Sequence, residues 1–225
     1  MRILTVCPSR GRPAKMKMMA DSFHETSEED NCLMIFIDKC DPCLEEYFSL
    51  LKDDMVVVND RMTNTKIFNF ALSRFPKCEY YHMTNDDFIY KTPGWDSKFV
   101  HILENKRCGI AYGNDLLQGQ SMATAPFISG DIVRALGWLQ LPDLDYLGGD
   151  VVWQTIGHKI DRLFYLPDVI IEHVHYQAKK AEIDETYKNT NSPARYEKDG
   201  QAFKKWIKER RIDLDVLKVR IACGL

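Results

Sequence analysis

The sequence predicts an α/β domain in which a mainly parallel sheet lies between two layers of helices. Short apolar runs that end in turn residues alternate with segments of helical periodicity through the first half, which is typical of stacked βα units. The length of 225 residues, with 45% hydrophobic and 28% charged residues, is that of an ordinary globular protein. The four strands expected in this half are residues 3–6, 32–37, 55–58 and 80–83, and four strands with helical crossovers are typical of a nucleotide-binding α/β half.

Helices are expected between these strands and after them. A helix over 13–23 opens with Pro13, where the missing N–H has no intrahelical partner to lose. A second helix over 65–75 follows Thr63 and Asn64, which are both possible caps. The rest of the pattern predicts a helix at 95–104, apolar runs at 109–112 and 122–128, helices at 131–136 and 150–156, and a strand pair at 163–166 and 169–171.

The composition changes beyond Gln177, where residues 177–213 hold ten Lys and Arg and seven Asp and Glu. Apolar residues are sparse there but recur at helical spacing near Phe203 and Trp206. We therefore expect a main domain over 1–190 and an amphipathic helical tail over 191–225 that packs on it. The basic cluster Lys204, Lys205, Lys208, Arg210 and Arg211 is either a solvated helix face or a patch for a polyanionic acceptor.

The composition also limits the partners and the location of the chain. A formal charge of −3 gives no global positive field, so nucleic acid binding is not supported, although a local basic patch leaves it open. Seven cysteines are an odd number in a chain large enough to bury a core, which favours reduced thiols and a cytoplasmic location. The apolar runs are all shorter than the ~18 residues of a membrane span, so any membrane association is expected to be peripheral.

Two groups of side chains carry the chemistry of a metal site. Asn85, Asp86 and Asp87 follow a strand at the sheet edge where ligands bind in open α/β folds. Adjacent carboxylates repel, and they tolerate each other best when a divalent cation lies between them and a phosphate. His173 and His175 share one face at the end of another strand, and imidazole is a common metal ligand. The alternatives are a polar turn for the first group and core or surface histidines for the second.

Asp150 is a third chemical candidate because it opens an amphipathic helix directly after Gly148 and Gly149. An acidic residue at this position is either a helix cap or a base presented to a cleft.

Taken in order, these segments resemble the inverting, family 2 type of GT-A glycosyltransferase over about residues 3–190. No single motif is strongly specific, and their order along the chain carries the resemblance. The matching segments are 8–13 after the first strand, 38–41 after the second, Asn85 to Asp87 after the fourth, Gly149 with Asp150, and 172–175.

The resemblance implies a GT-A fold and a donor diphosphate held by Mn²⁺ or Mg²⁺. Asn85 to Asp87 would be the DXD-type motif, in which Asp87 binds the metal and Asp86 or Asn85 lies near the ribose. Asn85 stands where the family usually has its first Asp. His173 or His175 would supply the imidazole ligand of the metal.

The resemblance also implies roles for residues outside the metal site. Asp38 would recognise the nucleotide base and Arg10 would lie beside base and phosphate. Lys66 and Asn69 fall where the third helix of the family approaches the nucleotide. Asp150 would be the general base that takes the proton of the acceptor hydroxyl.

The function implied is a metal-dependent inverting glycosyltransferase that moves a sugar from a nucleotide-sugar, with a UDP-sugar as the expected donor, to a hydroxyl acceptor of unknown class. One alternative is a nucleotidyltransferase that makes nucleotide-sugars, which would want a first loop richer in glycine and lysine. Another is a non-catalytic nucleotide-sugar-binding module, in which Asp150 is only a cap. We expect the acceptor side to be formed by Trp95, Tyr112, Asp115 and the tail.

Overall fold

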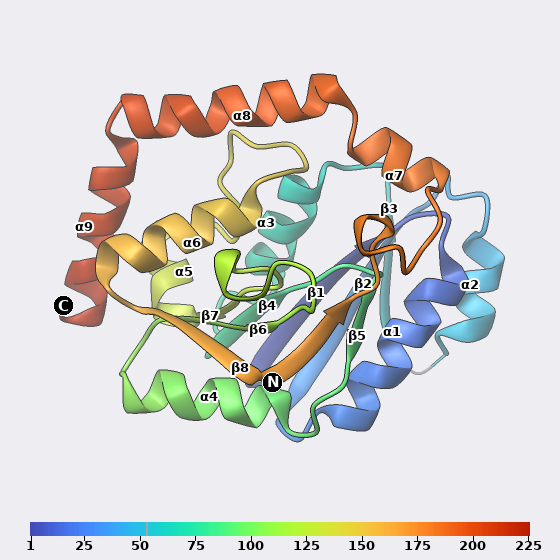
Figure 1. Cartoon of the computed structure of the whole chain (residues 1–225), viewed down its shortest axis with the longest axis horizontal. Helices are drawn as coiled ribbons and strands as arrows, with labels where there is room; N and C mark the ends of the chain where they lie inside the picture. Colours follow the sequence, from blue (N-terminus) through green and yellow to red (C-terminus); the bar gives the residue numbers. More distant parts are fainter. Residues whose placement is uncertain (53) are drawn as a thin grey trace.

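The structure is a computed structural model that describes residues 1–52 and 54–225. Within this described chain the strands form one eight-stranded sheet in the order β3-β2-β1-β4-β7-β6-β8-β5 (Figure 1). The strands are β1 (Ile3–Ser9), β2 (Asn31–Asp38), β3 (Met55–Asn59), β4 (Tyr80–Met83), β5 (Phe88–Tyr90), β6 (Ile110–Asn114), β7 (Phe127–Ser129) and β8 (Leu163–His173). The α-helices are α1 (Pro13–Thr26), α2 (Leu44–Leu50), α3 (Asn64–Arg74), α4 (Trp95–Asn105), α5 (Gly130–Leu136), α6 (Gly149–Ile160), α7 (Glu185–Thr190), α8 (Pro193–Lys208) and α9 (Arg211–Cys223). The 3₁₀ turns are η1 (Gly119–Ser121) and η2 (Tyr176–Ala178).

The first half of the sheet is parallel, as predicted. β1 pairs in parallel with β2 on one side and with β4 on the other, and β3 pairs in parallel with β2. The local signals also act as expected, because Pro13 begins α1 and the Thr63 side chain accepts a hydrogen bond from the Lys66 backbone N–H. These connections place the carboxyl ends of β1, β2 and β4 at one edge of the sheet.

The second half of the sheet differs from the prediction in two respects. β7 runs antiparallel to both β4 and β6, and a single strand, β8, replaces the expected strand pair. The register between β6 and β8 shifts after Gly113, which pairs with Leu166 while Asn114 pairs with Ile170. The bulge leaves Pro167 outside the ladder, where its missing N–H costs no sheet hydrogen bond.

Two hydrophobic cores cover the two faces of the sheet, which confirms the three-layer α/β/α prediction. On one face, α1, α2 and α4 bury Phe23, Tyr47 and Phe99 against the sheet. On the other face, α3, α5 and α6 bury Ile67, Val133 and Trp153, among others. The alternating side chains of β1 show this division, since its even-numbered residues enter one core and its odd-numbered residues the other.

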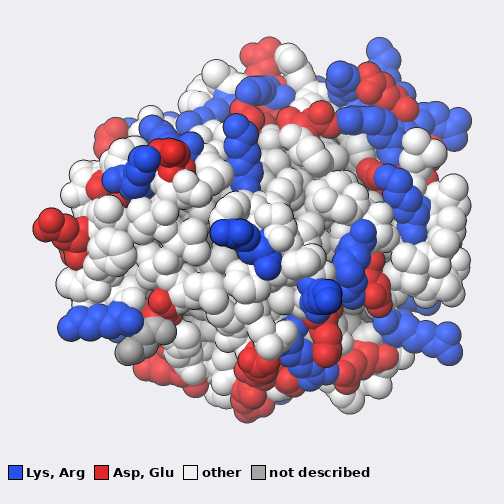
Figure 2. Space-filling model, turned by 180° about the vertical axis from the view of Figure 1, so that it is seen from behind, with Lys and Arg blue, Asp and Glu red and all other residues white. Residues whose placement is uncertain are grey.

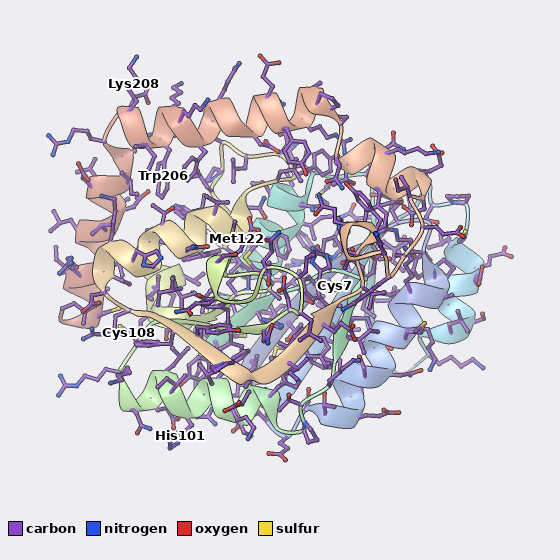
Figure 3. All side chains as sticks on the ribbon, viewed as in Figure 1. Cys7, His101, Cys108, Met122, Trp206 and Lys208 are labelled. Atoms are coloured by element: carbon purple, nitrogen blue, oxygen red, sulfur yellow. The ribbon has the colours of Figure 1, made fainter. Side chains whose placement is uncertain are left out.

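The C-terminal helices pack on the second of these cores, beside α5 and α6. The Trp206 side chain points from α8 into the core, and its indole N–H donates to the Asp215 carboxylate at 2.9 Å. Lys208, the last residue of the same helix, points outward (Figure 3). Basic side chains gather over the corner where α8 meets α9, at the upper right of Figure 2. Among the described residues, no helix has both the length and the apolar character needed to cross a membrane.

Candidate active site

A cavity of about 720 Å³ opens at the edge of the sheet where β1, β2 and β4 end. Its walls come from the loop after β1, the turn after β4, the turn that precedes α6, the end of β8 and the segment through α7 into α8. The predicted residues Arg10, Asp38, Asn85, Asp86, Asp87, Asp150, His173 and His175 all line it. The parallel topology explains this convergence, because strands that run in one direction deliver their following loops to the same edge.

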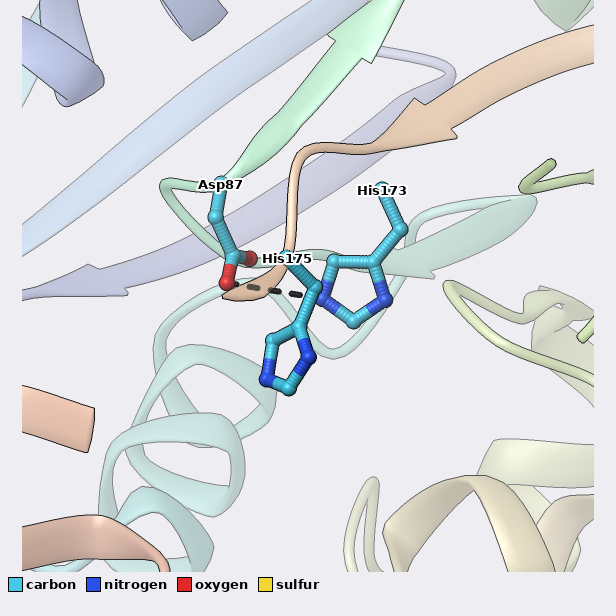
Figure 4. A group of neighbouring side chains, drawn as sticks. All are labelled: Asp87, His173 and His175. Atoms are coloured by element: carbon cyan, nitrogen blue, oxygen red, sulfur yellow. Dashed lines mark ion pairs between the residues drawn. The ribbon is translucent and has the colours of Figure 1, made fainter. Parts of the chain in front are cut away.

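The proposed metal ligands lie close together within this cavity. One ligand atom each from Asp87, His173 and His175 can be chosen so that all three lie within 4.8 Å of one another (Figure 4). His173 Nε2 is 3.4 Å from Asp87 Oδ2. Burial and the neighbouring His173 lower the pKa of His175, which favours the neutral imidazole that binds metals.

The sheet itself brings these three residues together. β5 pairs antiparallel with β8 so that Phe88 lies opposite His173, and the two rings stack at 4.4 Å between centroids. The ladder continues past Phe88, since the Val174 N–H donates to the Asp87 carbonyl at 2.8 Å. β5 has only three residues, too few to show a period in the sequence, so sequence reasoning missed the strand that builds the site.

The residues present fit a divalent metal ion. Asp87 Oδ1 and His173 Nδ1 are buried and have no hydrogen-bond partner among the described residues, although such atoms are almost always paired. Burial raises the pKa of Asp87, but His173 and the Tyr187 hydroxyl together outweigh burial and hold it below its ordinary value. One carboxylate and two imidazoles are a donor set suited to Mn²⁺ and similar cations.

Asp86 points away from this group and into a network of its own. Its Oδ2 accepts from the Ser9 hydroxyl at 2.7 Å, and its Oδ1 accepts from Arg12 Nη1 at 2.9 Å. Burial raises the pKa of Asp86, and the guanidinium of Arg12 opposes that rise. Asn85, by contrast, is exposed on the cavity wall.

Arg12 is a central residue that the sequence prediction missed. It is buried, and besides Asp86 it binds both carboxylate oxygens of Asp184 at 2.7 and 2.8 Å. Its guanidinium also lies 4.0 Å from the centroid of the Tyr187 ring. Residues 8–13 are among the segments that carry the family resemblance, which implies a role for Arg10 alone. No local signal in the sequence distinguishes Arg12 from Arg10.

Through Arg12, the segment before and within α7 becomes a wall of the cavity. Asp184 also pairs with Lys15 at 2.9 Å, and the Tyr187 hydroxyl donates to Asp87 Oδ2 at 2.8 Å. The wall continues into α8 with Arg195 and Tyr196, so it crosses the expected boundary at residue 190.

The loops after β1 and β2 are joined by an ion pair at the cavity wall. Arg10 Nη1 lies 2.7 Å from Asp38 Oδ2, and Asp38 is 7% exposed. Asp41 orders the same loop region by accepting from the Gly11 and Cys43 backbone N–H groups, each at 2.8 Å. The Asp38 side chain is thus held in place by the loop that follows β1.

The structure places two of the predicted donor contacts, Lys66 and Asn69, outside the cavity lining. Lys66 is exposed on α3. Asn69 forms hydrogen bonds to the backbone of the segment that follows α5. The Asn69 side chain donates to the Gln140 carbonyl and accepts from the N–H groups of Leu139 and Gln140. The helix presents a different face to the cavity, through Asn64, Ile67 and Phe68.

Asp150 lies at the start of α6, as predicted, with its side chain in the cavity wall. Gly148 adopts a left-handed φ of 84°, which explains the glycine that precedes the helix. Asp150 Oδ1 accepts from the Val151 N–H at 2.8 Å. Burial raises the pKa of Asp150, against the opposing effect of backbone N–H groups. The cap position belongs to Gly148, so Asp150 lies in the first turn of the helix, where its carboxylate can act as a base.

The predicted acceptor-side residues lie outside the cavity lining. Trp95 is fully buried, 4.7 Å from the Tyr90 ring and 4.9 Å from the His82 ring between centroids. Tyr112 is buried as well, and its hydroxyl donates to the Gln120 carbonyl. Large aromatic side chains contribute most by burial, and these two follow that rule.

Asp115 is also buried, and its Oδ2 lies 4.0 Å from His173 Nδ1. Its carboxylate accepts from the N–H groups of Leu117, Gln118 and Gly119, and its backbone carbonyl accepts from the His173 N–H at 2.9 Å. Asp115 thus fixes a loop against the strand that carries His173.

Comparison with known proteins links this fold to solved structures only. No protein-family model and no curated protein sequence matches the chain. The structure of Staphylococcus aureus TarS 1–349 is similar with 12% identity and a TM-score of 0.56, over 76% of this chain and 59% of that one. The mannosyltransferase PcManGT from Pyrobaculum calidifontis, solved with GDP-Man and Mn²⁺, is similar with 11% identity and a TM-score of 0.59, over 98% of this chain and 73% of that one.

A further TarS 1–349 structure contains UDP-GlcNAc and matches with 11% identity and a TM-score of 0.54, over 84% of this chain and 64% of that one. The chain therefore spans about three fifths of the length of the TarS 1–349 chain. Such low identities establish the fold alone. The chain has the Rossmann-like α/β fold of TarS and of the mannosyltransferase PcManGT, which is the fold expected of a GT-A glycosyltransferase.

Proposed function

We propose that the chain is a metal-dependent glycosyltransferase that moves a sugar from a nucleotide-sugar to a hydroxyl acceptor with inversion. The observation that carries this proposal is the group Asp87, His173 and His175, which shares one cavity with the carboxylate of Asp150. The similar structures were solved with UDP-GlcNAc in one case and with GDP-Man and Mn²⁺ in another, which is consistent with a donor of this class.

Asp87, with His173 and His175, would hold Mn²⁺ or Mg²⁺. A bound cation there would neutralise the negative charge that develops on the leaving diphosphate. The other roles belong to the chain itself. Arg10 and Asp38 bind the nucleotide at the neighbouring end of the cavity, and we propose a uridine nucleotide as their ligand.

Asp150 takes the proton of the acceptor hydroxyl as that oxygen attacks the sugar. A base of this kind activates the acceptor on the side opposite the leaving diphosphate, so the anomeric configuration inverts. The exposed ring of Tyr196 and the stacked pair of Arg195 on Tyr146, 3.9 Å from the ring centroid, lie beside this end of the cavity. These three side chains replace Trp95, Tyr112 and Asp115 as the residues expected to contact the acceptor.

Calorimetry on the Asp87→Ala variant tests the metal and the donor together. In Mn²⁺, the wild type should bind a UDP-sugar and the variant should lose at least tenfold in affinity, because it lacks the carboxylate ligand. The matched control is Asp131→Ala, which removes an exposed carboxylate on α5 and should bind as the wild type does. Equal affinity of Asp87→Ala and wild type in Mn²⁺ contradicts the metal site.

A panel of nucleotide-sugars then tests the reaction. Donor hydrolysis or transfer by the wild type supports the proposal, and the preferred donor identifies the nucleotide. Donor binding without turnover across the whole panel would instead support a non-catalytic binding module.

A further inference from the structure

Helix α9 exposes a stripe of aliphatic side chains that has no cover in the structure. Leu214, Leu217 and Ile221 are 61%, 54% and 74% exposed, and their spacing of three and four residues places them on one helical face. The opposite face of the helix buries Ile212 and Val219 in the core. The helix is therefore apolar on two sides, and core packing explains only one of them.

The surroundings of this stripe are strongly basic. Residues 201–225 hold seven Lys and Arg but only three Asp and Glu, although acidic residues are in excess over the whole chain. Lys204 and Lys208 lie on the outer face of α8 beyond ion-pair distance of any described carboxylate, whereas Lys218, which lies in the same helix as the stripe, pairs with Asp215 at 3.2 Å. Figure 2 shows this gathering of basic side chains over the corner between α8 and α9.

We propose that the α8–α9 corner docks on a membrane surface that carries anionic lipid. Aliphatic side chains on one face of a short helix, with lysines and arginines beside them, match the chemistry of that surface. The stripe enters the boundary between head groups and acyl chains, while the basic side chains pair with the lipid phosphates. A helix of 13 residues is too short to cross the bilayer, so α9 lies in the plane of the interface.

The charge pattern favours lipid over two other partners. A second copy docked on the same surface would place the basic side chains of both copies against each other, which opposes association. Nucleic acid would use the lysines through its phosphates, but it would leave Leu214, Leu217 and Ile221 without a partner. An anionic membrane satisfies the lysines and the aliphatic stripe together.

The docked chain would keep its cavity accessible. Tyr196 lines the cavity near the beginning of α8, whereas Lys208 is the last residue of the same helix. Lys208 follows Tyr196 by 12 residues, a rise of about 18 Å along the helix, so the docking corner and the cavity are separated by roughly that length. The corner can therefore bind a surface without covering the site.

Co-sedimentation with vesicles tests the proposal on the whole chain, without metal or donor. The wild type should bind vesicles of phosphatidylcholine mixed with phosphatidylglycerol at least tenfold more strongly than pure phosphatidylcholine. High salt should weaken the binding, because it screens the contacts of the exposed lysines. No binding to the anionic vesicles, or equal binding to both compositions, overturns the proposal.

Two variants separate the apolar and the ionic contributions. The triple change Leu214→Ser, Leu217→Ser and Ile221→Ser should reduce vesicle affinity at least tenfold, and Lys204→Gln with Lys208→Gln should reduce it roughly 30-fold. Matched controls are Met18→Ser, an exposed apolar residue on α1, and Lys98→Gln with Lys106→Gln, two exposed lysines in and after α4. The controls should bind as the wild type does, and circular dichroism should show all variants folded.

Two further measurements cover the rival partners. Analytical ultracentrifugation should show a monomer. If it shows instead a dimer that the triple change abolishes, and the wild type does not bind vesicles, the stripe belongs to a second copy and the proposal is overturned. Binding of a DNA or RNA duplex that depends on Lys204 and Lys208 but not on the stripe, again without vesicle binding, would overturn it in favour of nucleic acid. None of these outcomes depends on transfer activity, so the docking surface and the proposed function fail independently.

Discussion

The two adjacent carboxylates of the candidate site, Asp86 and Asp87, differ in their hydrogen-bond partners. Asp86 and Asp87 are neighbours, yet Arg12 and Ser9 satisfy the first while the second keeps one buried oxygen free among the described residues. The two carboxylates thus face different environments, and only Asp87 faces the histidines. This division explains how two adjacent buried carboxylates coexist.

Asp150 gives the most direct test of chemistry at this scale. Asp150→Asn should lower the rate of sugar transfer by about 100-fold or more, since an amide cannot accept the proton of the acceptor. Donor affinity, measured by calorimetry, should be unchanged. Retained turnover in this variant would exclude Asp150 as the base.

The pH dependence of the wild type follows from the same residue. Burial raises the pKa of Asp150, and the base works only when deprotonated. The value of kcat/KM should therefore fall as the pH decreases through this raised pKa, at a higher pH than an ordinary aspartate would give. A profile that stays flat down to the usual range of aspartate would contradict the assignment.

The Tyr187 hydroxyl is expected to orient a metal ligand, since it donates to Asp87 Oδ2 at 2.8 Å. Tyr187→Phe keeps the ring beneath Arg12 but removes this hydrogen bond, so Mn²⁺ affinity should fall about tenfold. Tyr196→Phe is the control, because its hydroxyl lies near Asn191 and away from the metal group. Equal Mn²⁺ affinity of both variants and the wild type, by calorimetric titration, would show that Tyr187 has no such role.

At the level of elements, the C-terminal helices build the cavity as well as cover the core. Asp199 of α8 is buried and accepts from the backbone N–H groups of Asp145, Tyr146 and Leu147 at 2.7 to 3.1 Å. These residues form the turn that leads into Asp150. Helix α8, which the sequence predicts as part of a packed tail, therefore also stabilises the turn before Asp150.

Removing this carboxylate should affect both stability and transfer. Asp199→Ala leaves three backbone N–H groups without their acceptor, so the free energy of unfolding in urea should fall by about 3 kcal/mol. Transfer should also slow, since the turn before Asp150 loses its support. Glu197→Ala, on the exposed side of the same helix, is the control and should change the unfolding free energy by less than about 0.5 kcal/mol.

The elements that sequence reasoning predicted and those that it missed differ in length and in the range of their contacts. The parallel strands β1 to β4 and helices α1 and α3 have strong local patterns, so the sequence indicates them directly. β5 has three residues and exists because β8 pairs with it, and β8 continues through Pro167 because a bulge removes that residue from the ladder. Pairing partners far along the chain decided both cases.

At the scale of the whole molecule, one buried histidine makes stability depend on pH. His82 is fully buried in the first core, and burial lowers its pKa to about 3. The unfolded chain binds a proton at this residue below about pH 6.5, whereas the folded chain does not. Stability therefore falls as the pH decreases from 6.5 towards 3.

Between pH 7.5 and pH 5, His82 alone should cost the wild type about 2 kcal/mol of unfolding free energy. The comparison needs the variant His82→Gln, because Asp86 acts in the opposite direction: burial raises its pKa to about 6, so its protonation favours the folded state in acid. Urea unfolding at both pH values should show a loss about 2 kcal/mol larger in the wild type than in the variant. Equal losses would contradict the lowered pKa of His82.

The sequence by itself determined the three-layer class, the parallel half of the sheet and the residues that follow each strand, because local periodicity and turn chemistry encode them. The sequence pattern therefore predicts that Asp38, Asp87 and Asp150 lie at the edge of the sheet where the parallel strands end. The tertiary structure decided what those residues face. Only long-range contacts bring His173 to Asp87, turn Trp95 into the core and fold Asp184 and the following helices onto Arg12. The His173–Asp87 and Asp184–Arg12 contacts join residues 86 and 172 positions apart, and no local pattern in the sequence records them.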